Sequence, residues 1–173
     1  MKIKKFHFFK IVLLLLPSTC LHAANPSTAT ISVTIPALVQ ISGLSDITLA
    51  PTNFGSPVTG ATTICIYTNV ITPLGSYYIT ATSANASSGL FRVANGANHI
   101  TYSAFWNSTS SPTQTVSLSS GVKTAQQLGG DSSSLTCGGT PDANFNISIS
   151  SSNVAGVLPG TFTDTVTIVV SPS

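Results

Sequence analysis

The chain has 173 residues, of which 42% are hydrophobic and 6% are charged, with six Lys and Arg, four Asp and no Glu. This balance excludes an intrinsically disordered chain, which needs low hydrophobicity or high net charge. Beyond residue 10 the only basic residues are Arg92 and Lys123, so no Lys/Arg cluster can bind phosphates and we expect no nucleic-acid partner.

The first segment has the pattern of a secretory signal peptide. Four lysines within the first ten residues precede the apolar run 11–16, and a stretch of small residues ends at Ala24. The apolar run is too short to span a bilayer, which takes about 20 residues. We expect residues 1–24 to be removed, with the mature chain starting near Ala24 or Asn25. A lipid anchor on Cys20 is the alternative, although residues 17–19 form a poor lipobox.

Removal of this segment changes the charge and the cysteine count. Two basic residues and four aspartates remain, so the mature chain has a net charge near −2. Cys65 and Cys137 also remain, and in an exported chain such a pair normally forms a disulfide, two free buried thiols being the alternative. About 150 residues are enough for one domain with a hydrophobic core.

The rest of the chain has the pattern of antiparallel strands and shows no sustained helical period. Short segments rich in Val, Ile, Thr, Tyr and Phe recur between clusters of Gly, Pro, Asn and Ser, which is typical of an all-β sandwich. The predicted strands cover residues 28–39, 47–49, 62–67, 76–82, 90–93, 99–106, 113–118, 143–150 and 161–170. Asn95-Gly96 predicts a turn, and residues 121–128 alone have a composition that suits a helical turn.

The two terminal strands carry most of the functional information. Apolar residues alternate with Thr and Ser along 28–35, and Pro36 follows, which marks the end of a paired stretch because proline cannot donate to a strand ladder. The last predicted strand, 161–170, is also amphipathic. Either these are the first and last strands of a complete sandwich, or the N-terminal strand serves a neighbouring molecule.

Residues 159–170, Pro-Gly-Thr-Phe-Thr-Asp-Thr-Val-Thr-Ile-Val-Val, resemble the C-terminal strand of chaperone–usher pilus subunits, especially the spore coat U-like branch. Residues 29–36, Ala-Thr-Ile-Ser-Val-Thr-Ile-Pro, and the following 41–49 are similar to the opening of the same group. The resemblance extends over essentially the whole mature chain in its layout, and the motifs that carry it are degenerate. It implies a single immunoglobulin-like β-sandwich that lacks its final strand and is completed by a donor strand.

The resemblance also implies roles for particular residues through donor-strand complementation, a form of strand addition. Residues 25–39 would be an N-terminal extension, and residues 40–173 the pilin-like domain. The donor residues that enter a neighbour's groove would be Ala29, Ile31, Val33 and Ile35, and this domain's own acceptor groove would include Val166, Ile168 and Val170.

The partners that the resemblance implies are a periplasmic chaperone, an outer-membrane usher and neighbouring pilus subunits, with export to the cell surface. Many pilins place their disulfide nearer the N-terminal part of the domain than Cys65 and Cys137, so the pilus subclass stays open. The chain has no additional N-terminal lectin domain, which favours a shaft subunit over a two-domain tip adhesin.

The residues suited to catalysis or metal binding are sparse, so we expect no enzyme, no metal and no cofactor. His99 is the single His beyond the signal, and a zinc site needs three or four ligands. Gly130-Asp131-Ser132-Ser133 is close to a serine-esterase motif but has no downstream His for a triad. A secreted hydrolase using Asp131, Ser132 or His99 is therefore a remote alternative.

A self-contained carbohydrate-binding or adhesive β-sandwich is the main alternative function. Aromatic side chains bind the faces of sugars, and three tyrosines and one tryptophan lie in the predicted strands 76–82 and 99–106. The residues available for such a platform are Tyr77, Tyr78, Tyr102 and Trp106. We expect Tyr102 and Trp106 to pack in the core instead.

Overall fold

The computed structural model describes residues 29–51, 53 and 55–173. The expected signal peptide, 1–24, and residues 25–28 of the expected extension lie outside the described residues. The chain divides into two units, Met1–Thr34 and Ile35–Ser173, and the second contains every described strand and helix. The proposed extension therefore crosses the boundary between the units, since Ile35–Val39 belong to the second one.

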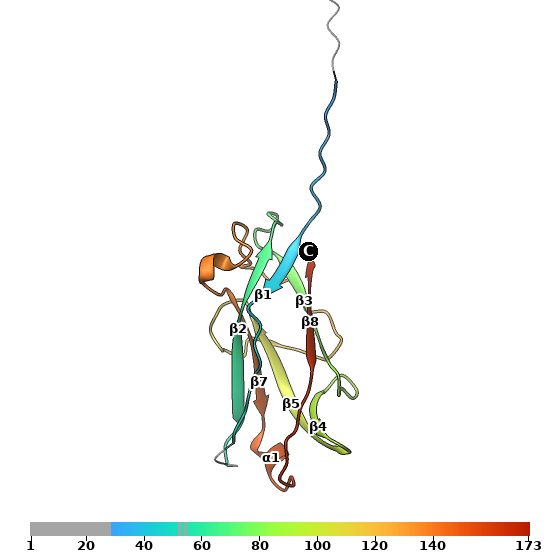
Figure 1. Cartoon of the computed structure of the whole chain (residues 1–173), viewed down its shortest axis with the longest axis vertical. Helices are drawn as coiled ribbons and strands as arrows, with labels where there is room; N and C mark the ends of the chain where they lie inside the picture. Colours follow the sequence, from blue (N-terminus) through green and yellow to red (C-terminus); the bar gives the residue numbers. More distant parts are fainter. Residues whose placement is uncertain (1–28, 52, 54) are drawn as a thin grey trace, which may run out of the picture. The chain divides into compact units, whose positions relative to one another are not determined.

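Residues 35–173 form two antiparallel sheets (Figure 1). The larger sheet has the order β1-β2-β7-β5-β4, with β6 also paired to β5, and the smaller consists of β3 and β8. This all-β arrangement confirms the predicted immunoglobulin-like sandwich. The strands are β1 Val39–Ser42, β2 Val58–Thr68, β3 Tyr77–Ser83, β4 Phe91–Asn95, β5 Asn98–Asn107, β6 Val116–Ser117, β7 Ala143–Ile149 and β8 Val166–Pro172; the helical elements are η1 Cys137–Gly139 and α1 Ser151–Val154.

The alternation of apolar residues along the strands places the core between the sheets, because successive side chains of a strand point to opposite faces. Trp106 of β5 is fully buried, and its Nε1 donates to the Tyr77 hydroxyl at 3.2 Å. The Tyr77 and Trp106 rings meet edge to face, with centroids 6.3 Å apart. Since Tyr102 is also 4% exposed, the core interpretation of Tyr102 and Trp106 is confirmed. A surface platform that includes these aromatics and Tyr77 is wrong.

Several local predictions need correction. Residues 29–38 and 47–49 form no strand, and the first strand begins only at Val39. Residues 121–128 form no helix, because their backbone pairs with β3: Thr124 N donates to Ile79 O at 2.9 Å, and Gln127 N to Tyr77 O at 2.8 Å. The short helix α1 was not predicted from the sequence.

The turn predicted at Asn95-Gly96 is confirmed. Asn95 pairs with Asn98 at the end of the β4–β5 hairpin, so Gly96 and Ala97 form a two-residue loop. Gly96 has a φ of 59°, in the left-handed region that favours glycine.

A disulfide joins Cys65, in β2, to Cys137, in η1, which confirms the predicted bond. The two residues are 72 positions apart in the sequence, with Cα atoms 5.7 Å apart. The bond ties the long loop between β6 and β7 to the larger sheet. Among the described residues, no helix has the length and apolar character needed to cross a bilayer.

Replacing both cysteines by alanine should lower the free energy of unfolding by about 4 kcal/mol, because the bond closes a long loop in the unfolded chain. Urea unfolding of the variant and of the unsubstituted chain, each with and without a reductant, measures this loss. Reduction should destabilise the unsubstituted chain alone. An unfolding midpoint that is the same in all four samples would contradict the prediction.

Candidate functional site

One edge of β8 has no strand partner among the residues that the structure describes. β8 pairs with β3 from Pro172↔Tyr77 to Val166↔Ser83, and this ladder uses its other edge. An open edge presents unpaired N–H and C=O groups, which are a template for another strand. β8 is therefore available for strand addition along the part of this edge that β1 does not contact.

An apolar groove lies beside β8, formed by two adjoining cavities of about 570 and 650 Å³. Its floor is the inner face of the larger sheet, with residues from β4, β5 and β7. One wall is the segment 44–51, and the other consists of residues 154–168. The residues that line both cavities are Ile47, Leu49, Val93, Ile147 and Phe162.

A glycine positions the first wall. Ile47 and Leu49 are half-buried and lie over Gly60 of β2, where a Cβ atom would be 2.4 Å from Ile47 Cγ2 and 2.6 Å from Leu49 Cδ2. The backbone N and the hydroxyl of Ser45 also bond to Thr62 Oγ1, at 3.2 and 2.8 Å. The segment thus follows β2 without adding a ladder of its own, which leaves the groove open between it and β8.

A polar network fixes the second wall where it enters β8. The Tyr102 hydroxyl donates to Asp164 Oδ2 at 2.6 Å, and Asn85 Nδ2 donates to Asp164 Oδ1 at 3.1 Å. Arg92 Nε donates to the Asn85 carbonyl at 2.8 Å. Burial raises the pKa of the Tyr102 hydroxyl well above its usual value, and Asp164 raises it further, so Tyr102 remains a donor at any physiological pH.

The structure brings two of the three sequence-predicted groove residues into the lining. Val166 and Ile168 line the first cavity, whereas Val170 packs against the core and is not part of the lining. The sequence interpretation missed Val93, Phe162 and the turn 154–160. The alternation in 47–49 is the sequence signal for Ile47 and Leu49, but it predicts an ordinary strand, which the structure does not contain.

The predicted donor residues lie on a segment without strand pairing. Ile31, Val33 and Ile35 are 89%, 81% and 75% exposed, and Ala29 is exposed as well. After them the chain is fixed to the domain, because Asn69 Nδ2 donates to Pro36 O at 3.0 Å. The side chains of Ile31, Val33 and Ile35 are therefore largely exposed to solvent.

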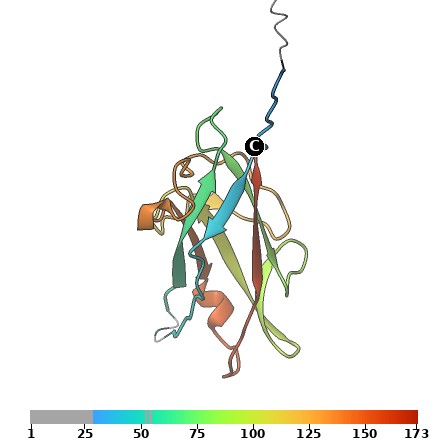
Figure 2. The same ribbon diagram turned by 45° about the horizontal axis from the view of Figure 1, so that its top comes forward.

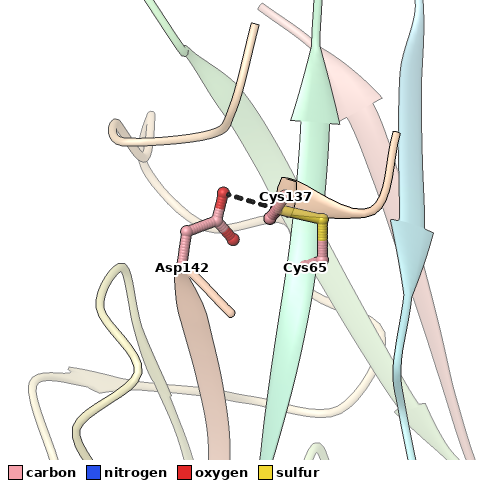
Figure 3. A group of neighbouring side chains, drawn as sticks. All are labelled: Cys65, Cys137 and Asp142. Atoms are coloured by element: carbon pink, nitrogen blue, oxygen red, sulfur yellow. Dashed lines mark hydrogen bonds between the residues drawn. A yellow bond between two sulfur atoms is a disulfide. The ribbon is translucent and has the colours of Figure 1, made fainter. Parts of the chain in front are cut away.

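The cysteines and Asp142 form a compact cluster (Figure 3). Asp142 accepts from Ile66 N at 2.9 Å and from Asp131 N at 3.0 Å, and its Oδ2 lies 3.3 Å from Cys137 Sγ. A disulfide sulfur carries no proton to donate and is no thiolate, so these residues do not make a metal site while the bond is intact. Burial raises the pKa of Asp142, against the two backbone N–H donors that lower it.

The residues of the hydrolase alternative have other roles. The Asp131 carboxylate accepts from Ser133 N at 2.6 Å and from the Ser133 hydroxyl at 2.7 Å, so it caps its own turn, and the pKa of Asp131 is lowered by these bonds. Ser132 is exposed in that turn. His99 is exposed near the start of β5, where it pairs with Ala94. These contacts supply no hydrogen bond between a nucleophile and a base.

No family model matches the sequence. No curated protein matches it either. Among solved structures, similarity is found to a chain of a chaperone–tip adhesin complex that is vital for synergistic activation of CFA/I fimbriae biogenesis, with a TM-score of 0.54 and 18% identity over 78% of this chain and 41% of that chain. A chain of the CsuC–CsuE chaperone–tip adhesion subunit pre-assembly complex, from archaic chaperone–usher Csu pili of Acinetobacter baumannii, has a TM-score of 0.47 and 18% identity over 80% of this chain and 40% of that chain.

The first of these similarities shows a shared fold. At 18% identity it shows the fold alone. The chain spans about two fifths of the length of either matched chain.

Tyr102→Phe should lower the free energy of unfolding by about 1–3 kcal/mol, because Asp164 loses a hydrogen bond at a carboxylate. Tyr78→Phe is the matched control, since its ring keeps the contact with Lys123 Nζ, 4.2 Å from the ring centroid. Chemical unfolding of both variants measures the difference. Equal stability of the two variants would contradict a role for the network in holding this wall.

Asp142 should make the domain relatively more stable in mild acid. Its pKa is raised in the folded state, so folding favours proton uptake, and the stabilisation is complete below the ordinary pKa of 3.8 and is lost as pH rises through the raised value. The stability of the unsubstituted chain relative to Asp142→Asn should thus increase as pH falls from 7 toward 4. Melting temperatures of both chains across this range measure the trend, and a gap that narrows toward acid would contradict it.

Proposed function

We propose that this chain is a structural subunit of a surface pilus that polymerises by donor-strand exchange after chaperone–usher export. The observation that carries the proposal is the apolar groove along the open edge of β8, in a chain that also has an exposed, alternating apolar segment at 29–35. A strand of that pattern satisfies the edge and fills the groove at once.

The lengths of donor and groove agree. Residues 29–35 in an extended strand span about 20 Å, and the wall residues 161–168 span about 23 Å, at 3.3 Å per residue. Four apolar side chains on one face of the donor would then lie along the groove. Burial of each Val or Ile contributes about 1.5–3 kcal/mol.

The charges also suit this use. Residues 25–39 contain no charged side chain, and the charged residues in the groove lining are Asp46 and Asp164. Asp164 is already bonded to Tyr102 and Asn85. The donor therefore brings no ion of its own into the groove, where burial of a charge would oppose binding.

The proposal assigns three kinds of partner to the groove and the extension. A periplasmic chaperone lends a strand to the groove before assembly, an outer-membrane usher is the place of exchange, and a neighbouring subunit supplies the final strand. The shared fold with a chain from a chaperone–tip adhesin complex supports this assignment.

Ile31→Asp or Val33→Asp should abolish polymerisation, because a carboxylate would have to enter the apolar groove. Ser32→Asp, on the opposite face of the extension, is the matched control and should polymerise. Unboiled denaturing gels of the exported full-length chain measure the outcome as a heat-labile ladder. Normal ladders from Ile31→Asp and Val33→Asp would overturn the donor role.

A truncated chain completes this experiment. Without residues 25–37 the domain should form no ladder, and it should bind a peptide that matches residues 28–39. A single monomer band and equal melting temperatures for the full-length and truncated chains would instead indicate a complete sandwich, for which glycan binding is the next assay.

A further inference from the structure

Exposed apolar side chains gather on the loop between β2 and β3. Ile71 and Leu74 are 73% and 63% exposed, and they face each other across an isolated bridge. Leu38, which precedes β1, is 51% exposed. It is held to the same loop because Leu38 N donates to Asn69 Oδ1 at 2.7 Å, and Asn69 N donates to Leu38 O at 3.1 Å. We name Leu38, Ile71 and Leu74 the apolar tip.

The N-terminal extension leaves the domain at the apolar tip. Asn69 bonds to Pro36 as well as to Leu38, so the chain from Pro36 onward is fixed to the loop that carries Ile71 and Leu74. Any molecule that holds the extension up to Ile35 is thus brought beside this loop.

The acceptor groove opens at the opposite end of the domain. The turn 154–160 follows α1 and lines the second cavity, and α1 lies far from the start of β1 and from the C-terminus in Figures 1 and 2. At the other end, β1 lies beside β8. β8 runs from the turn 154–160 toward this end, so the C-terminal end of a strand antiparallel to β8 lies at the turn. A donor strand that runs antiparallel to β8 therefore leaves the groove at the turn 154–160.

The connection between donor strand and domain is short. Ile35 is separated from Val39 by Pro36, Ala37 and Leu38 alone. The four peptide links between the Cα atoms of Ile35 and Val39 reach about 14 Å at most. The donating domain must therefore abut the receiving one, with its apolar tip toward the receiving turn. That turn presents Leu158, which is 73% exposed.

We infer that the apolar tip of one subunit packs against the Leu158 turn, residues 157–160, of a second copy of this chain. This inference rests on the proposed donor-strand function and adds a second contact at each joint. The tip and the turn cover each other's exposed apolar surface, and the joint is a fixed domain–domain contact instead of a free hinge.

Cysteine cross-linking in the exported full-length chain tests the contact. The double substitution Leu74→Cys with Leu158→Cys places one thiol on the tip and one on the turn. Both side chains are largely exposed, and the Cys65–Cys137 bond is buried. Because Leu158 also lines the second cavity, the unboiled ladder of the double variant shows first that donor binding is kept. The matched control combines Leu74→Cys with Val122→Cys, because Val122 is 56% exposed on the segment that pairs with the middle of β3. Samples are compared unboiled, boiled without reductant and boiled with reductant.

The expected result is a ladder from Leu74→Cys/Leu158→Cys that survives boiling and collapses with reductant, while the control ladder is lost on boiling. Heat-labile ladders from both chains, with no boiling-resistant ladder from the tip–turn pair, would overturn the contact and leave donor-strand exchange intact. An equally resistant ladder from the control would also overturn it, since the cross-link would not be specific. If the unsubstituted chain forms no ladder even unboiled, the donor-strand proposal itself fails, and the contact fails with it.

A measurement without cross-links tests the same joint. Ile71→Ser with Leu74→Ser should lower the temperature at which the ladder dissociates, relative to Val122→Ser. An unchanged dissociation temperature would contradict a packed joint.

Discussion

The structure depends on a mismatch between its two sheets. A sandwich is stable when each sheet covers the apolar face of the other. Here the smaller sheet has two strands, β3 and β8, and cannot cover the whole inner face of the larger one. Ile147 and Val93 therefore face a groove where a strand would otherwise lie, beside an unpaired edge of β8. A strand added in this groove would bury the apolar surface and pair the free backbone groups of β8, so both effects favour its addition.

An uncovered core face tends to collapse, so the groove needs supports that hold its walls apart. On one side Ile47 and Leu49 rest on Gly60, and on the other the Tyr102 hydroxyl holds Asp164. The first support is steric and the second is polar. The side chains of both supports line the first cavity. In the proposed function, a groove held open in this way would reduce the ordering that binding of a strand must supply.

The sequence predicted the fold wherever one strand carried its own signal. Alternation identified β5 and β7, and Asn95-Gly96 identified the hairpin turn. Prediction from the sequence failed where the structure of a segment depends on residues far away along the chain. Residues 121–128 pair with β3 instead of forming a helix, because β3 offers its second edge. Ile47 and Leu49 alternate with polar residues as in a strand. They pack on β2 instead, because Gly60 has no side chain and leaves room for them. Val166 and Ile168 follow from the pattern of the last strand, whereas Phe162 and Val93 meet in the groove only through the closure of the sandwich.

The composition of the extension reconciles two opposing demands. A segment such as 29–35, with high β-propensity and no charge, is a hazard for uncontrolled strand association while it is exposed. The same features mean that, in the proposed function, the segment would carry no charge of its own into an apolar groove. Pro36 limits the hazard because it has no N–H to continue a ladder. The Thr and Ser residues on the other face keep hydroxyls toward water in both states. In the proposed donor-strand exchange, residues 29–35 would thus make one specific pairing, and the three-residue connection to β1 would make this pairing also fix where the next domain lies.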